Sequence, residues 1–283
     1  MANPNSIWVD LLSCKVHYTG TKYRTRVIEA GDGEPLVLIH GGGGHAEAYS
    51  RNVVRLGTNF RAMAIDMVWH GLSSNPPFKG QAIPVYADQV IDLLDTLGIA
   101  KAHIEGEAIG GRVAMWLAIH HPERVQKLVL NNTGGVRFKT AQVEPQVESA
   151  SRYATAASAA IENPTRETIR QRLERLMVTP DRVTDELVEV RYRFYSNPQT
   201  QQAQLNLRAT GHESFDENEV ATIRVPTLVI ATPHNPLRGM DAGRQLAALI
   251  PGARFHLIED AAIWMQWEHP EKHDRAVMEF LKE

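Results

Sequence analysis

The chain has 283 residues, of which 43% are hydrophobic, and it carries a formal net charge of −3 from 33 acidic and 30 basic residues. This length and composition suit one large α/β domain with an insertion. Because the charges are mixed and nearly balanced, we expect neither nucleic acid nor an anionic membrane surface as a partner. The single cysteine, Cys14, excludes an internal disulfide framework and a cysteine-rich metal site.

Targeting signals are absent from the sequence as we read it. The first ten residues show no basic stretch followed by an apolar run, and no segment approaches the ~18 to 20 apolar residues of a membrane span. Together with the lone cysteine, this favours a cytoplasmic protein. The sequence leaves a homodimer open.

Short apolar runs alternate with helical patterns along the first half of the chain. The predicted strands lie at residues 36–39, 62–66, 102–105 and 127–130, and the predicted helices at 85–97 and 110–120. Strands that alternate with helices in this way are typical of a mostly parallel sheet flanked by helices. The fold class is therefore α/β.

The alternation stops at residue 135 and resumes at 221. Between these points, helix-forming segments at 144–163 and 165–197 are separated or bounded by Pro164, Pro180 and Pro198. A strand at 227–231, a helix at 242–250, a strand at 253–258 and a helix after Pro270 complete the chain. We therefore predict a core in two parts, residues 1–134 and 221–283. Residues 135–220 form an inserted helical lid over the carboxyl ends of the strands, where open α/β sheets bind ligands.

Two glycine-rich turns follow predicted strands. Residues 106–111 read Gly-Glu-Ala-Ile-Gly-Gly and lead into a helix, which matches a nucleophile elbow except that its centre is Ala108. Residues 40–44 read His-Gly-Gly-Gly-Gly, as in hydrolases whose glycine loop supplies one N–H of the oxyanion hole. The predicted oxyanion-hole donors are Gly42 and Ile109.

With these motifs the chain resembles an α/β-hydrolase-fold protein, and it is similar to the meta-cleavage product hydrolases that cut C–C bonds in aromatic catabolism. The resemblance runs from about Gly31 to the C-terminus. Residues 262–270 read Ala-Ile-Trp-Met-Gln-Trp-Glu-His-Pro, which aligns with the family's G-H-W and W-E-H pattern and puts Ile263 in the place of the catalytic histidine. Asn235 stands in the place of the acid. An alternative acid position holds Asn131 and Asn132, so no carboxylate is restored.

The resemblance extends to the predicted lid. It implies that Arg191 contacts a substrate carboxylate, that Phe215 lies near an aromatic wall and that Trp264 borders the binding site. The alternatives are that Arg191 is a solvated helix residue beside Glu189 and that Trp264 belongs to the core. We favour the binding roles.

The residues at the three triad positions exclude the usual serine-hydrolase mechanism. A methyl group cannot attack a carbonyl, and neither isoleucine nor asparagine replaces a histidine base and its acid. An oxyanion hole alone still supplies roughly 10³-fold catalysis. Replacement acid/base candidates are His45, which follows the glycine loop, and Glu107, whose pKa would rise in a half-buried turn. His70 and His234 are two further candidates, for which we favour a structural role and a position facing solvent, respectively. The histidine spacings predict no metal, and nothing in the sequence implies a cofactor.

Two classes of function remain. The first is a non-serine enzyme that acts on a small carboxylate-bearing carbonyl compound from aromatic or dienone metabolism, by C–C cleavage, lyase chemistry or tautomerisation. The second is a catalytically silent protein that binds or senses a small molecule. A cofactor-free oxygenase is a third option, although Ile263 removes the histidine base that such relatives need. We favour the enzyme because His45 and Glu107 would place ionisable groups beside the hole.

Overall fold

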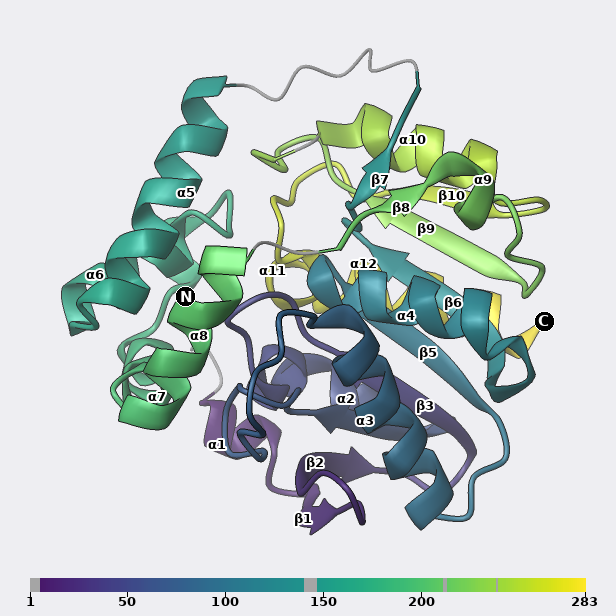
Figure 1. Ribbon diagram of the computed structural model, residues 1–283, viewed down its shortest axis with the longest axis horizontal. Helices are drawn as coiled ribbons and strands as arrows, with labels where there is room; N and C mark the ends of the chain where they lie inside the picture. The colour runs from purple at the N-terminus through teal and green to yellow at the C-terminus, as the bar shows by residue number, and fades with distance from the viewer. Residues whose placement is uncertain (1–5, 140–146, 211–212, 238) are drawn as a thin grey trace.

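The computed structural model describes residues 6–139, 147–210, 213–237 and 239–283. Its centre is an eight-stranded sheet with the order β1-β2-β4-β3-β5-β6-β9-β10 (Figure 1). The strands are β1 (Lys15–Thr19), β2 (Thr25–Ala30), β3 (Glu34–Ile39), β4 (Phe60–Ile65), β5 (Ala102–Glu107), β6 (Val125–Asn131), β9 (Thr227–Ala231) and β10 (Arg254–Leu257). Strand β2 runs antiparallel to β1 and β4, and the other neighbouring pairs are parallel.

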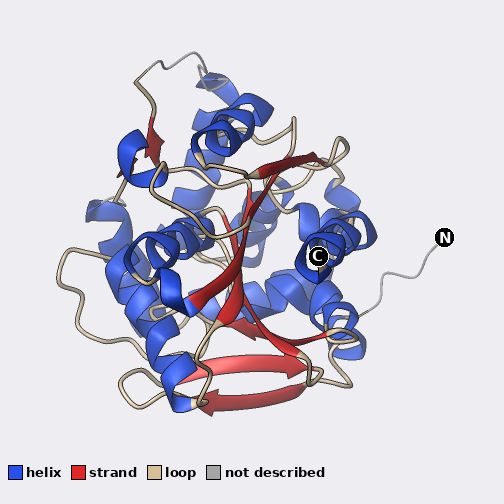
Figure 2. Ribbon diagram, turned by 90° about the vertical axis from the view of Figure 1, so that its right-hand side faces the viewer, coloured by secondary structure: helices blue, strands red, loops and turns tan. Residues whose placement is uncertain are grey.

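Helices cover both faces of the twisted sheet (Figure 2). Alternate side chains of β3 enter different cores: Val37 and Ile39 pack with α3, α4 and α10, whereas Leu36 and Leu38 pack with α2 and α12. The helix bounds are α2 (Ser50–Leu56), α3 (Ile83–Thr96), α4 (Ile109–His120), α10 (Gly239–Leu249) and α12 (Pro270–Lys282). Burial on both faces explains why the central strands read as apolar runs.

Residues between β6 and β9 form a helical segment at one end of the sheet (Figure 1). We use the name helical segment for α5 (Val147–Glu162), α6 (Arg166–Glu174), α7 (Asp185–Tyr195) and α8 (Pro198–Thr210). The side chains of Thr165 and Thr184 cap α6 and α7 by accepting from backbone N–H groups. The smaller elements of this region are β7 (Val136–Arg137), the 3₁₀ turn Pro180–Arg182, β8 (Phe215–Asp216) and α9 (Glu217–Val220).

Four further short elements complete the list. They are α1 (Ile7–Asp10), the 3₁₀ turns Ala46–Tyr49 and Pro122–Arg124, and α11 (Met265–Glu268). Within the described ranges, no helix combines the length and the apolar character that a membrane crossing requires.

The predicted fold class is confirmed, and each of the six predicted strands overlaps an observed one. The helix-forming segment expected over 165–197 holds two helices, because the chain leaves α6 at Glu174 and turns at Pro180 before α7 begins. The helix expected over 144–163 begins in residues outside the described ranges and continues as α5. Strands β1 and β2 escaped prediction because polar and charged residues interrupt their apolar pattern.

The sheet register brings the predicted motifs to one edge. Ile39 is paired with Gly106, Glu107 with Asn131, and Asn131 with Ile230. The carboxyl ends of β3, β5, β6 and β9 therefore lie side by side, and the turns that follow these strands meet at the same edge of the sheet.

Candidate functional site

The turn from β5 to α4 keeps the geometry of a nucleophile elbow. Ala108 has φ 50° and ψ −103°, and its N–H donates to the Asn131 carbonyl at 2.9 Å. A non-glycine residue at positive φ is uncommon and stores strain. A Cβ on Gly106 would lie 2.2 Å from the Gly110 carbonyl oxygen, so this tight turn depends on glycine. The chain retains a strained elbow although its central side chain is a methyl group.

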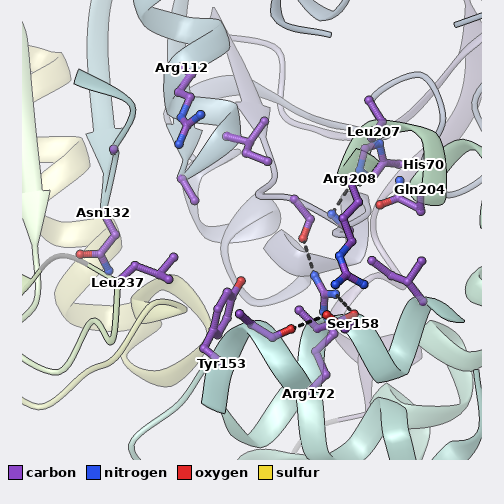
Figure 3. Close-up of a pocket in the computed structure, with 18 of the residues that line it drawn as sticks. His70, Arg112, Asn132, Tyr153, Ser158, Arg172, Gln204, Leu207, Arg208 and Leu237 are labelled. Carbon is purple, nitrogen blue, oxygen red and sulfur yellow. Dashed lines mark hydrogen bonds between the residues drawn. The ribbon is translucent and has the colours of Figure 1, made fainter. Parts of the chain in front are cut away.

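A cavity of about 350 Å³ lies over the elbow (Figure 3). Ala108 and Ile109 line it together with Gly42 and Gly43 of the glycine loop. The remaining described lining residues come mainly from the helical segment and the strand ends: His70, Tyr86, Arg112, Asn132, Gly134, Tyr153, Ala154, Ala157, Ser158, Ile161, Arg172, Gln204, Leu207, Arg208, Asn235 and Leu237. Both predicted oxyanion-hole residues thus border one cavity.

Protein acceptors engage the amides on either side of Gly42. The Gly41 N–H donates to the Glu107 carboxylate at 2.7 Å, and the Gly43 N–H donates to Nε2 of His70 at 3.1 Å. Nδ1 of His70 lies 3.0 Å from the Val68 carbonyl, which fixes the tautomer with the proton on Nδ1. His70 therefore holds the glycine loop, and its two ring nitrogens already have partners.

The helical segment grips the same loop through its carbonyls. Nη2 of Arg172 donates to the Gly42 carbonyl at 2.9 Å. The Gly43 carbonyl accepts from Nη1 of Arg191 at 2.6 Å and from the Tyr195 hydroxyl at 3.1 Å. Helices α6 and α7 consequently fix the loop that the oxyanion-hole hypothesis requires to be rigid.

Arg191 is buried behind the loop. Arg191 is only 1% exposed, so the alternative that it is a solvated helix residue is wrong. The guanidinium lies 5.3 Å from the Trp264 ring centroid and 5.9 Å from that of Tyr195. The described lining of the cavity contains Arg172 but neither Arg191 nor Trp264. Trp264 stacks on Trp267 in the core, with ring centroids 5.4 Å apart.

His45 points away from the place that we expected. It is fully buried, its Nδ1 lies 2.7 Å from a Glu47 carboxylate oxygen, and its ring meets Phe194 edge-on at 4.7 Å. Burial lowers the pKa of His45. His45 does not belong to the described cavity lining, because Glu47 draws the ring into the buried Arg26–Glu47–Asp66 cluster.

Glu107 lies next to Ala108 but under the glycine loop. Burial raises the pKa of Glu107 to about 7, against the opposing effects of the Gly41 hydrogen bond and of Arg191 and Arg172. This rise has the direction and the cause that we expected from the sequence. Glu107 also lies outside the described cavity lining, and it contacts the glycine loop through the Gly41 amide.

The two other predicted triad positions, Asn235 and Ile263, have different surroundings. Asn235 lines the cavity and its Oδ1 accepts from the Leu237 N–H at 3.0 Å. Ile263 is 2% exposed and packs in the core on the α2 and α12 side of the sheet. Phe215 is likewise buried, near Trp116 at 6.3 Å between ring centroids, and is not in the described lining.

Asn132, set aside in the sequence as a lost acid, ties the strand ends together. It has φ 44°, and its Nδ2 donates to Thr232 Oγ1 and to the carbonyls of Ala262 and Ile263 at 2.9–3.1 Å. Its Oδ1 accepts from the Thr232 N–H at 3.2 Å. An amide suits this position because it both donates and accepts.

Sequence reasoning missed the polar residues that the helical segment brings to the cavity, of which Arg172 is the clearest. A signal was present: Arg172 falls between Ile169 and Leu173 on the buried face of α6, where an arginine needs a partner. Tyr153 and Arg208 carry no comparable signal, since their positions depend on how the helices pack.

Comparison with known proteins places this arrangement in context. A family model described as "alpha/beta hydrolase fold" matches residues 34–270. The chain is 32% identical over 272 residues to a 2-hydroxymuconate semialdehyde hydrolase of Pseudomonas putida, with 92% of each chain covered. It is 30% identical to a 2-hydroxy-6-oxononadienedioate/2-hydroxy-6-oxononatrienedioate hydrolase of Burkholderia vietnamiensis, with 93% of this chain and 92% of that protein covered.

A solved structure gives the same result. The meta-cleavage product hydrolase of Pseudomonas fluorescens IP01, as a serine-to-alanine mutant complexed with acetates, superposes with a TM-score of 0.81 at 27% identity, covering 96% of this chain and 98% of that one. The chain therefore belongs to the α/β-hydrolase fold family and, within it, resembles the meta-cleavage product hydrolases.

Proposed function

We propose that the protein is a non-serine enzyme that acts on a small carboxylate-bearing carbonyl compound from aromatic or dienone metabolism. The observation that carries this proposal is the strained Ala108 turn, which still faces a cavity bordered by Gly42 and Ile109. Strain at a backbone position persists only where the surrounding structure maintains it. The names of the relatives, hydrolases of semialdehyde and of dienedioate or trienedioate compounds, support this class of substrate.

The chemistry that suits this site starts from a polarised carbonyl. The N–H groups of Gly42 and Ile109 would stabilise an enolate or dienolate oxygen as negative charge develops. In a tautomerisation, the enol O–H gives its proton to water and water delivers another proton to carbon, so proton transfer is needed but no nucleophile. C–C cleavage by water needs in addition an activated water that adds to the carbonyl, and among the described lining residues His70, which could activate it, already binds on both nitrogens. Tautomerisation or lyase chemistry is therefore favoured over hydrolysis.

We assign recognition of the ligand carboxylate to Arg172, and no longer to Arg191 as the sequence suggested. Arg172 lines the cavity and already bonds to the glycine loop, whereas Arg191 lies behind it. A guanidinium binds a carboxylate through charge-assisted hydrogen bonds. The helical segment would then act as a lid that both closes the cavity and orients the ligand.

A silent binder is the second candidate. It is favoured by the described cavity lining, which contains no aspartate or glutamate, and by the position of His45 and Glu107 outside that lining. A cofactor-free oxygenase has less support. Such an enzyme would need a histidine base at position 263, and this chain has an isoleucine there that is buried in the core.

A screen of ring-cleavage products, related 2-oxo acids and their amides tests the proposal, with binding followed by calorimetry and turnover by dienolate absorbance. We expect turnover of at least one acid, and a loss of acid binding of about tenfold or more in Arg172→Gln with little change for the amide. Arg175→Gln, an exposed arginine three residues further along, is the matched control. Binding without turnover of any compound would establish the silent binder instead.

A further inference from the structure

One face of α5 borders the cavity over the elbow. The residues of this face that line the cavity are Tyr153, Ala154, Ala157, Ser158 and Ile161. Their positions repeat every four residues, which brings their side chains to one side of a helix. Alanine and isoleucine offer only apolar surface, whereas tyrosine and serine offer hydroxyl groups. The proposed tautomerisation needs a group that passes a proton to carbon, so the ionisable lining residues are the candidates for this step.

Two of these candidates are already engaged in hydrogen bonds. The hydroxyl group of Ser158 donates to the Ala154 carbonyl at 2.7 Å. Nδ1 of His70 donates to the Val68 carbonyl at 3.0 Å, and its Nε2 accepts from the Gly43 N–H at 3.1 Å. Either side chain would have to give up a hydrogen bond before it could transfer a proton. The arginines of the lining keep their protons in proteins and are not acids at neutral pH.

The hydroxyl group of Tyr153 is not held in this way. The residue is half-buried, and within the described ranges its hydroxyl group has no hydrogen-bond partner. Figure 3 shows the ring rising from its helix with the hydroxyl group directed toward the middle of the cavity. This group is therefore available to a ligand.

Arg172 joins this face of α5 to the glycine loop. Its Nη1 donates to the Ala157 carbonyl at 3.3 Å, and its Nη2 donates to the Gly42 carbonyl at 2.9 Å. Ala157 follows Tyr153 by one helical turn on the same face. One guanidinium thus connects the helical turn beside Tyr153 with the loop of the proposed oxyanion hole. A ligand whose oxygen lies at Gly42 has this face of α5 as a neighbour.

The charges around Tyr153 suit a phenol that loses its proton transiently. Burial raises the pKa of Tyr153, and Glu107 and Tyr195 add to the rise, but Arg172 and Arg191 oppose it. The hydroxyl group consequently carries its proton at neutral pH, as a proton donor must. The two guanidiniums would stabilise the phenolate that remains after the transfer.

Tyr86 is a second tyrosine in the described lining, and its surroundings are different. Its ring packs against Trp69 and His70, with centroid distances of 5.5 and 5.9 Å. Burial raises the pKa of Tyr86, and Glu213 raises it further. A phenolate at this position would face a carboxylate instead of guanidiniums, which disfavours Tyr86 as the donor.

We infer that Tyr153 is the proton donor of the proposed tautomerisation and gives its hydroxyl proton to carbon of a dienolate whose oxygen lies at Gly42 and Ile109. The inference rests on the proposed function and assigns a step that is otherwise left to water. The Oη–H bond breaks and a C–H bond forms, while an electron pair on the dienolate oxygen makes the C=O double bond. The phenolate takes a proton from water, and water has received one from the enol O–H. Protons therefore balance, and nothing is oxidised or reduced.

The test follows ketonisation of 2-hydroxyhexa-2,4-dienoate in D₂O, because a fixed acid delivers the deuteron to one face of the dienolate and gives a CHD carbon of one configuration. Loss of dienol absorbance gives kcat and KM, and NMR with a chiral shift reagent gives the configuration. Tyr153→Phe keeps the ring and removes the acid. We expect kcat to fall by about 100-fold or more, KM to change by less than about threefold, and both configurations to form.

Two further variants serve as comparisons. Tyr192→Phe is the matched control, because Tyr192 belongs to α7 of the same helical segment but is not in the described lining. Tyr86→Phe tests the other tyrosine of the described lining. Both variants should keep kcat within about threefold of the unmodified chain and form one configuration.

Four results would overturn the inference. They are a mixture of configurations from the unmodified chain, a kcat for Tyr153→Phe within about threefold of the unmodified value, the large loss in Tyr86→Phe instead, and turnover of other acids in the screen but not of this dienol. The proposed function stands in each of these cases, because the unmodified chain still turns over an acid. If no compound of the screen is turned over, the proposed function fails and the inference fails with it.

Discussion

Arg172 donates from the helical segment to the carbonyl of Gly42 at 2.9 Å, in the loop whose Gly42 and Gly43 line the cavity. One side chain therefore connects the two parts of the candidate site. A ligand that draws the guanidinium toward its own carboxylate would also affect the loop that orients its carbonyl. In the proposed function, this contact would couple binding of the ligand to its activation.

Restoring the triad tests the register of the three substituted positions. Ala108→Ser alone should leave p-nitrophenyl ester hydrolysis near background, because the hydroxyl group lacks its base. Adding Asn235→Asp and Ile263→His should raise the rate by about tenfold or more over the single variant. Initial rates with p-nitrophenyl acetate measure this. Esterase activity in the unmodified chain that a serine-directed reagent abolishes would show that another nucleophile is present.

Asn132 should contribute to stability through its hydrogen bonds. Asn132→Ala removes the donor to the Ala262 and Ile263 carbonyls and the acceptor of the Thr232 N–H, which leaves buried polar groups unpaired. We expect the free energy of unfolding in urea to fall by about 1 to 3 kcal/mol. Asn218→Ala, at an exposed position, is the comparison and should change it by less than about 0.5 kcal/mol. Similar values for the two variants would show that the Asn132 contacts are unimportant.

Glu107 should make stability depend on pH. Its pKa rises from an ordinary 4.5 to about 7 on folding, so the folded state binds the proton more tightly and stability falls as pH increases from about 5 to about 7. Glu107→Gln keeps an acceptor for the Gly41 N–H and removes the titration. The free energy of unfolding of this variant, measured relative to that of the unmodified protein, should therefore be about 2 to 3 kcal/mol higher at pH 8 than at pH 5.

Urea unfolding at the two pH values measures the gain, and Glu123→Gln, at an exposed site, should show none. An unchanged difference between pH 5 and pH 8 would mean that Glu107 titrates as in the unfolded chain. A difference of the opposite sign would mean that the arginines dominate its environment and keep it ionised.

Arg191 is expected to position the loop without reading the ligand's charge. Arg191→Met removes the donor to the Gly43 carbonyl, so kcat should fall while acids and their amides lose affinity by similar factors. The ratio of their dissociation constants is the quantity to measure. A selective loss for the acids of about tenfold or more would show that Arg191 touches the ligand anion.

The sequence by itself determined the fold, and it predicts that Ala108, Asn235 and Ile263 stand at the three triad positions. Apolar runs that alternate with helices require a covered parallel sheet, and the glycines at 106, 110 and 111 permit a turn that few other residues fit. These are local requirements, so the places of Ala108, Gly42 and Ile109 could be predicted from spacing. The absence of a serine at the elbow is also visible in the sequence alone.

Only the tertiary structure decided which polar side chains face the cavity. His45 was predicted from the sequence and Arg172 was missed. Glu47 draws His45 into the buried cluster with Arg26 and Asp66, whereas α6 packs so that Arg172 reaches the glycine loop. The direction of a loop or helix side chain depends on partners that lie far away in sequence, because a buried polar group must find its hydrogen bonds wherever the fold provides them. For that reason the location of the candidate site could be predicted from local motifs. The charged residues that line it could not, because they depend on how the helical segment packs over the sheet.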